Sequence, residues 1–216
     1  MIQRFRRKGV VTSPAALTPE LAREIRESFE AAAADEEHFP STIDPRIEHV
    51  RLLVRELSVL PTPLIADVGS GKGRFARVLG EEIPGARLVC SDVSLNMLAH
   101  VRPPLSGCAA SMTSLPFCDG GFDAAYATES LEHAVDIATA VGEICRIVRP
   151  GGRIVIIDKN KEHWGKLKTP EWERWFTRGE LERLLSRHCR GVRSQYISYW
   201  EDVAPDGMFL AWVAER

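Results

Sequence analysis

Two carboxylates and an imidazole lie within five residues of one another, at Glu129, Glu132 and His133. Positions i, i+3 and i+4 share one face of a helical turn, so a single turn here would bring these candidate catalytic side chains together. Such a group can hold a divalent ion such as magnesium, manganese or zinc. Without a metal, His133 can act as a general base. A third interpretation is structural, with Glu132 solvating the turn and His133 packed on a sheet.

A glycine-rich turn after a predicted strand is the second feature with chemical meaning. Residues 65–73 read Ile-Ala-Asp-Val-Gly-Ser-Gly-Lys-Gly, and glycines here allow backbone N–H groups to approach a ligand closely. The spacing differs from the GxGxxG of dinucleotide-binding proteins and from a P-loop. Asp92 lies 25 residues beyond Asp67, at the end of the next predicted strand, where an acid can bind both ribose hydroxyls. These residues predict an adenosine-type ligand.

Four stretches make the chain resemble the class I S-adenosylmethionine-dependent methyltransferases, and among them the type 11 group. In order, they are residues 65–73, 90–92, 115–123 and 143–152. The resemblance covers about residues 64–216 and implies a Rossmann-like, seven-stranded, mostly parallel sheet with a C-terminal antiparallel hairpin. It also implies S-adenosylmethionine as the cofactor and methyl transfer as the activity.

The resemblance implies a role for residues along the whole length of the cofactor. Asp67, Gly69 and Gly71 would hold the methionine end, and Asp92 would bind the ribose. In many relatives an aspartate ahead of an LPF stretch bonds the adenine amino group, and here Ser111 stands in its place. The predicted cofactor-binding residues are Asp67, Gly69, Ser70, Gly71, Gly73, Asp92, Val93, Ser111, Met112 and Thr128.

The stretch from Glu129 to His133 also bears on the substrate. Its ExxEH pattern is similar to the metal-binding stretch of ubiquinone-type O-methyltransferases and of small-RNA 2′-O-methyltransferases. Asp158-Lys-Asn160 is similar to the quinone-precursor enzymes, whereas the LPF and DGGFD stretches are more typical of menaquinone-type C-methyltransferases. We expect O-methylation of a small-molecule hydroxyl, with a possible divalent cation such as magnesium. The alternatives are C- or N-methylation of a small metabolite, or cofactor binding without catalysis.

Aromatic and basic side chains gather between residues 163 and 176. Trp172, Trp175 and Phe176 would line an apolar or aromatic substrate pocket. The basic residues of this stretch, Lys166, Lys168 and Arg174, would attract an anionic group of the substrate. Ordinary cover of the sheet edge is the alternative interpretation of this segment.

Hydrophobic periodicity predicts the elements that position these residues. Strands are expected at 64–68, 87–91, about 109–110, 122–128 and 153–157. Helices between them are expected at 74–82, from Ser94, and from Asp136 to about 148, which is the α/β pattern of a parallel sheet with helices on both faces. Two last strands, 194–200 and 208–214, are too close together for a parallel crossover and predict an antiparallel hairpin.

Two further helices are predicted ahead of the sheet. Thr18-Pro19 and Asp44-Pro45 are pairs of an N-cap and a first-turn proline, and the helices that follow are expected to end near residues 38 and 57. We expect residues 1–60 to form a small N-terminal helical cap and residues 61–216 to form the cofactor-binding methyltransferase domain. The acidic first helix is either a lid or a solvated face with apolar residues packed beneath.

Composition limits the class of protein. The chain has 216 residues, a formal net charge of −2, 44% hydrophobic and 27% charged residues, which is typical of a soluble globular protein. No apolar run approaches the ~20 residues needed to cross a bilayer, and no global basic charge favours nucleic acid. Five scattered cysteines predict neither disulfides nor a zinc knuckle. We therefore expect a cytoplasmic monomer or homodimer that acts on a small molecule, with no nucleic-acid partner and no membrane insertion.

Overall fold

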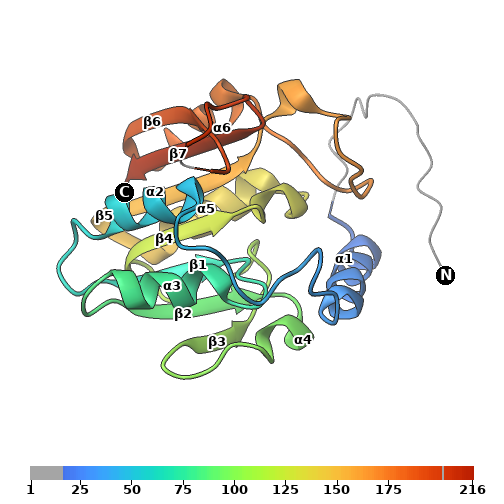
Figure 1. Cartoon of the computed structure of the whole chain (residues 1–216), viewed down its shortest axis with the longest axis horizontal. Coiled ribbons are helices and arrows are strands. Elements are labelled where there is room, and N and C mark those ends of the chain that lie inside the picture. The colour runs from blue at the N-terminus through green and yellow to red at the C-terminus, as the bar shows by residue number, and fades with distance from the viewer. Residues whose placement is uncertain (1–16, 201) are drawn as a thin grey trace.

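The fold is a seven-stranded sheet in the order β3-β2-β1-β4-β5-β7-β6, seen in a computed structural model that describes residues 17–200 and 202–216 (Figure 1). Its strands are β1 (Leu64–Val68), β2 (Arg87–Asp92), β3 (Ser106–Ala109), β4 (Phe122–Thr128), β5 (Val148–Lys159), β6 (Arg190–Ile197) and β7 (Phe209–Glu215). Strand β7 runs antiparallel to β5 and β6, and the other neighbours are parallel. The predicted Rossmann-like α/β sheet and its C-terminal antiparallel hairpin are confirmed.

Helices cover both faces of the sheet. Helices α2 (Glu48–Leu57) and α3 (Arg74–Glu82) pack on one face, and α5 (Ile137–Ile147) and α6 (Arg178–Leu185) pack on the other (Figure 1). Successive strand residues point to opposite faces, so Ile65 joins the core under α2 and α3 while its neighbour joins the core under α5 and α6. A strand buried on both faces must be almost wholly apolar, which is why β4 and β5 were readable in the sequence.

Side-chain oxygens cap the starts of four helices. The oxygens of Thr18, Ser94, Asp136 and Thr177 accept N–H groups at the starts of α1 (Pro19–Ala32), α4 (Leu95–Leu98), α5 and α6. The expected start at Asp44 is wrong, because α2 begins at Glu48. The Asp44 carboxylate instead accepts from the backbone and guanidinium of Arg46.

The two N-terminal helices have different neighbours. Helix α2 buries Leu52, Leu53 and Leu57 in the core of the sheet, whereas α1 lies across the ends of the strands and contacts α4 (Figure 1). Helix α1 ends at Ala32, earlier than expected, and turns connect it to α2. Residues 1–16 of the predicted cap lie outside the described residues, so a separate cap over 1–60 stays a prediction. No helix in the described part of the chain is long and apolar enough to traverse a bilayer.

Candidate active site

A cavity of about 1320 Å³ lies at the carboxyl ends of β1, β2 and β4. Its walls come from the glycine loop after β1, the ends of these strands, the loop before α6, and α1. Ligand sites for one small molecule are typically ~300–1,000 Å³, so this cavity has room for a nucleotide-sized ligand and a small second molecule. An open parallel sheet binds its ligands at this edge, as the sequence predicted.

The glycine loop is anchored to the end of β2. The N–H groups of Gly69 and Ser70 donate to the Ser91 carbonyl at 2.8 and 3.0 Å, and the N–H of Gly71 donates to Asp92 Oδ2 at 2.8 Å. Gly69 has φ +76°, and a Cβ there would lie 2.5 Å from Ser130 Cβ, so no larger residue fits. Gly71 has φ +53°, but a Cβ there would meet no atom within 4 Å. The loop therefore needs glycine for packing at one position and leaves open space at the other.

These two glycines provide a matched pair of variants. We expect Gly69→Ala to lower the free energy of unfolding by about 2–4 kcal/mol, because left-handed strain and overpacking against Ser130 add together. Gly71→Ala should cost about 1–2 kcal/mol, since only its φ is unfavourable. Urea denaturation of the two variants measures the difference. Equal losses would show that the close approach to Ser130 has no energetic weight.

Asp67, next to the last residue of β1, is a buried carboxylate that lacks a complete set of partners. Its Oδ2 accepts no hydrogen bond from the described residues, and burial raises the pKa of Asp67 to about 7. The hydroxyls of Ser70 and Thr128, which also line the cavity, are likewise buried without partners. Unpaired buried polar groups are rare in folded proteins. Their concentration here indicates a polar ligand at this end of the cavity.

Asp92 has the geometry of a ribose-binding carboxylate. Its Oδ2 accepts from Gly71 N at 2.8 Å and its Oδ1 accepts from Ser94 N at 2.9 Å. A carboxylate offers about four acceptor positions, so two remain for a pair of hydroxyl groups. Burial raises the pKa of Asp92, while the two backbone donors oppose that shift.

Nine of the ten predicted cofactor-binding residues line the cavity, and Gly73 does not. Gly73 precedes α3 with φ +73°, and a Cβ there would meet Val101 and Cys90 on the side of the core. Ser111, in the place of the family's aspartate, has its hydroxyl 2.8 Å from that of Thr113. The placement agrees with the predicted nucleotide site, while the contacts of the individual residues stay predictions.

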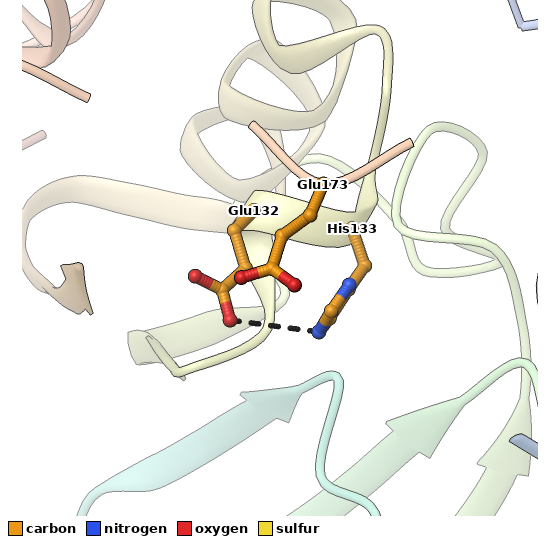
Figure 2. Close-up of side chains that lie close together, drawn as sticks. All are labelled: Glu132, His133 and Glu173. Carbon is orange, nitrogen blue, oxygen red and sulfur yellow. Dashed lines mark ion pairs between the residues drawn. The ribbon is translucent and has the colours of Figure 1, made fainter. Parts of the chain in front are cut away.

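The expected convergence of Glu129, Glu132 and His133 is wrong for Glu129. A 3-10 turn, η1 (Leu131–His133), begins only after Glu129, which has φ +50° and turns its carboxylate to within 3.7 Å of the Arg74 guanidinium. His133 Nε2 lies 3.5 Å from Glu132 Oε1. The third member is Glu173, from the loop before α6, and one donor atom from each of the three lies within 4.8 Å of the others (Figure 2). No sequence motif marked Glu173, which lies 40 residues from His133.

A partly buried lysine joins this cluster from the end of β5. Lys159 Nζ donates to the Glu132 carboxylate and lies 3.2 Å from Glu173 Oε1. The backbone N–H of Glu132 donates to Asp158 Oδ2 at 3.1 Å. Burial, together with the charge of Asp158, raises the pKa of Glu132 well above its usual range. Burial likewise raises the pKa of Asp158 to about 6. The cluster therefore holds a buried ion pair and carboxyl groups that retain protons more readily than usual.

His133 is held as a neutral ring in the cavity wall. Burial, and to a lesser extent the charge of Lys159, lowers the pKa of His133 to about 3. The ring packs edge-on against Phe29 of α1, with 5.0 Å between the ring centroids, and its Nδ1 accepts no hydrogen bond from the described residues. The unpartnered nitrogen of a neutral imidazole can accept a hydrogen bond from a ligand hydroxyl.

Helix α1 forms one wall of the cavity and is fastened at its C-terminal end. Glu30 accepts from the N–H groups of Leu95 and Asn96 at the start of α4, at 2.9 and 2.8 Å. Beyond the helix, Glu36 pairs with the buried Lys72 of the glycine loop at 2.5 Å, and this contact lowers the pKa of Glu36 to about 2. The acidic helix therefore covers the cavity, and a lid motion stays a prediction.

The aromatic segment before α6 contributes less to the cavity than the sequence suggested. Trp172 and Lys168 line it, together with Phe29 and Phe39. Trp175 and Phe176 are buried instead, the first against Trp164 and the second against Trp212, so the expectation that they line the pocket is wrong. Lys166, which contacts His163, and Arg174 are not among the lining residues either.

The chain is similar to known methyltransferases. A family model described as "Methyltransferase domain" matches residues 66–156. The demethylmenaquinone methyltransferase of Renibacterium salmoninarum is 30% identical over 171 residues, which cover 76% of this chain and 70% of that protein. The O-methyltransferase cnsE of Penicillium expansum is 34% identical over 123 residues, 51% of this chain and 45% of that protein. The chain thus spans less than half of the fungal enzyme.

A solved structure shares the fold over nearly the whole chain. It is the 1,6-didemethyltoxoflavin-N1-methyltransferase of Burkholderia thailandensis, with bound 1,6-didemethyltoxoflavin and S-adenosylhomocysteine. The TM-score is 0.70 at 23% sequence identity, and the match covers 95% of this chain and 93% of that one. At this level of identity the comparison establishes the architecture of the sheet and its helices.

Proposed function

Because the chain belongs to the class I S-adenosylmethionine-dependent methyltransferases, we propose that it transfers a methyl group to a hydroxyl oxygen of a small aromatic molecule. One observation carries the proposal. The same cavity is lined by the unpaired oxygens of Asp67, Ser70 and Thr128 and by the neutral His133, which packs against Phe29. We assign the residues that follow β1 and β2 to the cofactor and the surroundings of His133 to the acceptor.

Each residue assigned to the cofactor would bind a different part of it. The Asp67 carboxylate would accept hydrogen bonds from the ammonium group at the methionine end. Asp92 would accept hydrogen bonds from the two ribose hydroxyls with its remaining lone pairs. The open space at Gly71 leaves the backbone accessible to the ligand. S-adenosylmethionine supplies an already activated methyl group, so the protein has to align the acceptor with it and remove the acceptor's proton.

His133 is the residue we assign to proton removal. Its Nε2–H faces Glu132 Oε1 at 3.5 Å, which leaves Nδ1 to take the proton of the substrate hydroxyl. Glu132 is a positioning residue in this scheme, since it orients the ring. Phe29, Phe39 and Trp172 would stack on the aromatic part of the acceptor, and Lys168 would attract an anionic substituent.

Binding of the cofactor product should depend on the ionisation of Asp67. With a pKa of about 7, the carboxyl is largely protonated at pH 6 and ionised at pH 8, and only the ionised form pairs with an ammonium group. We expect S-adenosylhomocysteine to bind about tenfold more weakly at pH 6 than at pH 8. Calorimetric titration at the two pH values measures this ratio. Asp67→Asn should bind weakly with little pH dependence, and a flat profile in the unmodified protein would contradict the assignment.

Carbon methylation is the second candidate, favoured by the similarity to a demethylmenaquinone methyltransferase. Proton removal from a hydroquinone would activate the ring carbon as well as the oxygen. The two outcomes are separated by incubating the protein with 13C-methyl-labelled S-adenosylmethionine and a panel of small phenols and hydroquinones. NMR of the product then identifies the methylated atom. A methyl group on oxygen supports the proposal, whereas methyl on carbon or nitrogen, or no product from any acceptor, opposes it.

A further inference from the structure

The cluster beside the cavity contains three side chains of the two kinds, carboxylate and imidazole, that divalent metals bind, and a cation already lies among them. Glu132, His133 and Glu173 place one donor atom each within 4.8 Å of the others (Figure 2). The ammonium of Lys159 bonds to the first carboxylate and lies 3.2 Å from the second. The Lys159 side chain is only 14% exposed, and its Nζ lies 5.7 Å from the centre of the Trp175 ring.

We propose that Lys159 is a built-in cation that takes the place of a metal ion in this cluster. Its ammonium neutralises the facing carboxylates of Glu132 and Glu173 and keeps divalent ions from binding beside His133. Lys159 is thereby a positioning residue, because it holds the glutamate that orients His133. The role in methyl transfer rests on the proposed function, whereas the exclusion of metal can be measured without it.

The backbone of Glu132 and the carboxylate of Glu173 have contacts that do not involve Lys159. The backbone of Glu132 is held on both sides, since its N–H donates to Asp158 Oδ2 at 3.1 Å and its carbonyl accepts from Arg174 N at 2.8 Å. Glu173 Oε1 accepts from Trp175 Nε1 at 2.6 Å. Both side chains are almost fully buried. Loss of the ammonium would therefore leave a preformed acidic site and not a collapsed one.

A site emptied of its lysine has the chemistry of a transition-metal site. Two carboxylates and one imidazole, with a side open to the cavity, form a ligand set that suits zinc or cobalt. Two buried carboxylates without a neutralising partner are costly, which gives a divalent ion an additional reason to bind. Lys159→Met keeps an apolar stem of similar length against Trp175 and removes only the charge, so it isolates the electrostatic effect.

Cobalt(II) provides a direct readout, because its visible absorption reports coordination by protein ligands. We expect no cobalt spectrum from the unmodified protein at 1:1 stoichiometry, and binding at least 100-fold tighter in Lys159→Met. The double variant Lys159→Met/Glu173→Gln should lose this binding. Lys161→Ala is the matched control, since Lys161 is an exposed lysine that also pairs with a glutamate, Glu180. It should behave as the unmodified protein does.

Two results would overturn the inference. One is a cobalt site in the unmodified protein that disappears in Glu173→Gln, which would make the cluster a true metal site. The other is a folded Lys159→Met protein, judged by circular dichroism, that binds no cobalt. If Lys159→Met fails to fold, Lys159→Ala is tested in its place. The methyl-acceptor panel is read on the unmodified protein. If Lys159→Met gains cobalt binding while the unmodified protein methylates no phenol, the proposed function is refuted and this inference stands.

Measuring the turnover of Lys159 variants distinguishes a positioning role of Lys159 from a general loss of structure. With an acceptor identified by the panel, a chelator should leave the activity of the unmodified protein unchanged. Lys159→Met should lower kcat at least tenfold with little change in KM, and Lys159→Arg should recover most of that loss because it restores the charge. Loss of activity on chelation, or equal activity in Lys159→Met, would contradict a positioning role.

Discussion

Asp92→Ala is expected to weaken the binding of S-adenosylhomocysteine at least 100-fold. The variant removes the acceptor of two ribose hydroxyls, and hydrogen bonds to a charged group contribute roughly 1.5–3 kcal/mol each. It also removes the partner of Gly71 N, which ties the glycine loop to the end of β2. Isothermal titration calorimetry of the purified variant gives the affinity, and the thermal unfolding midpoint shows whether the fold is intact.

A neutralised carboxylate elsewhere is the control for this experiment. Glu81 is exposed on α3, away from the cavity lining, so Glu81→Ala should bind S-adenosylhomocysteine as the unmodified protein does. If Asp92→Ala is folded and retains the affinity of the unmodified protein, Asp92 does not hold the ribose, and the assignment of this end of the cavity fails.

His133→Ala is expected to lower kcat by about 10²–10⁴-fold, the usual contribution of a general base. Its affinity for S-adenosylhomocysteine should change by less than about threefold, because the imidazole lies toward the acceptor end of the cavity. The measurement is methyl transfer to the best phenol of the panel, with product quantified by mass spectrometry. The loss should be the same in His133→Phe, which retains packing against Phe29 but has no nitrogen to accept a proton.

His188→Ala provides the comparison, since His188 is exposed and does not line the cavity. It should keep full turnover. A His133→Ala protein with unchanged kcat would assign proton removal to another group, or show that the acceptor is already ionised. A loss of cofactor affinity equal to the loss of kcat would mean that His133 shapes the cofactor site.

Local signals were sufficient to predict much of the fold. Strands β1 and β4 and helix α3 begin and end where their apolar patterns do. The caps at Ser94 and Asp136 form as expected, because each depends only on residues within one helical turn. The order of the strands was available only through the family resemblance, since pairing such as that of β1 with β4 joins residues about 60 apart.

The candidate site was predictable where it follows the strand ends and not where it depends on distant loops. Asp67 and Asp92 lie in the cavity because each ends a strand of the parallel sheet. Glu173 comes from a loop whose path is set by its own contacts, among them the bond from Trp175 Nε1. Glu129 was misplaced because the short-range spacing rule assumes a helical turn, and its φ of +50° breaks that turn.

The position of α1 over the cavity also depends on contacts between residues far apart in the sequence. The sequence left open whether the acidic first helix is a lid or a solvated face, because its apolar stripe suits both. The structure places the helix over the cavity through Glu30, which accepts from the N–H of Leu95 at the start of α4, 65 residues away in the sequence. The acidic charge of α1 is thus partly used to fasten the helix over the site.

The proposed function requires that the cavity at the carboxyl ends of β1, β2 and β4 bind S-adenosylmethionine with its methyl group directed toward His133. A crystal structure of the protein with S-adenosylhomocysteine tests it most directly. We predict the ribose on Asp92, the methionine end beside Asp67 and the sulfur on the side of His133. A ligand in the reverse orientation, or bound outside this cavity, would contradict the account.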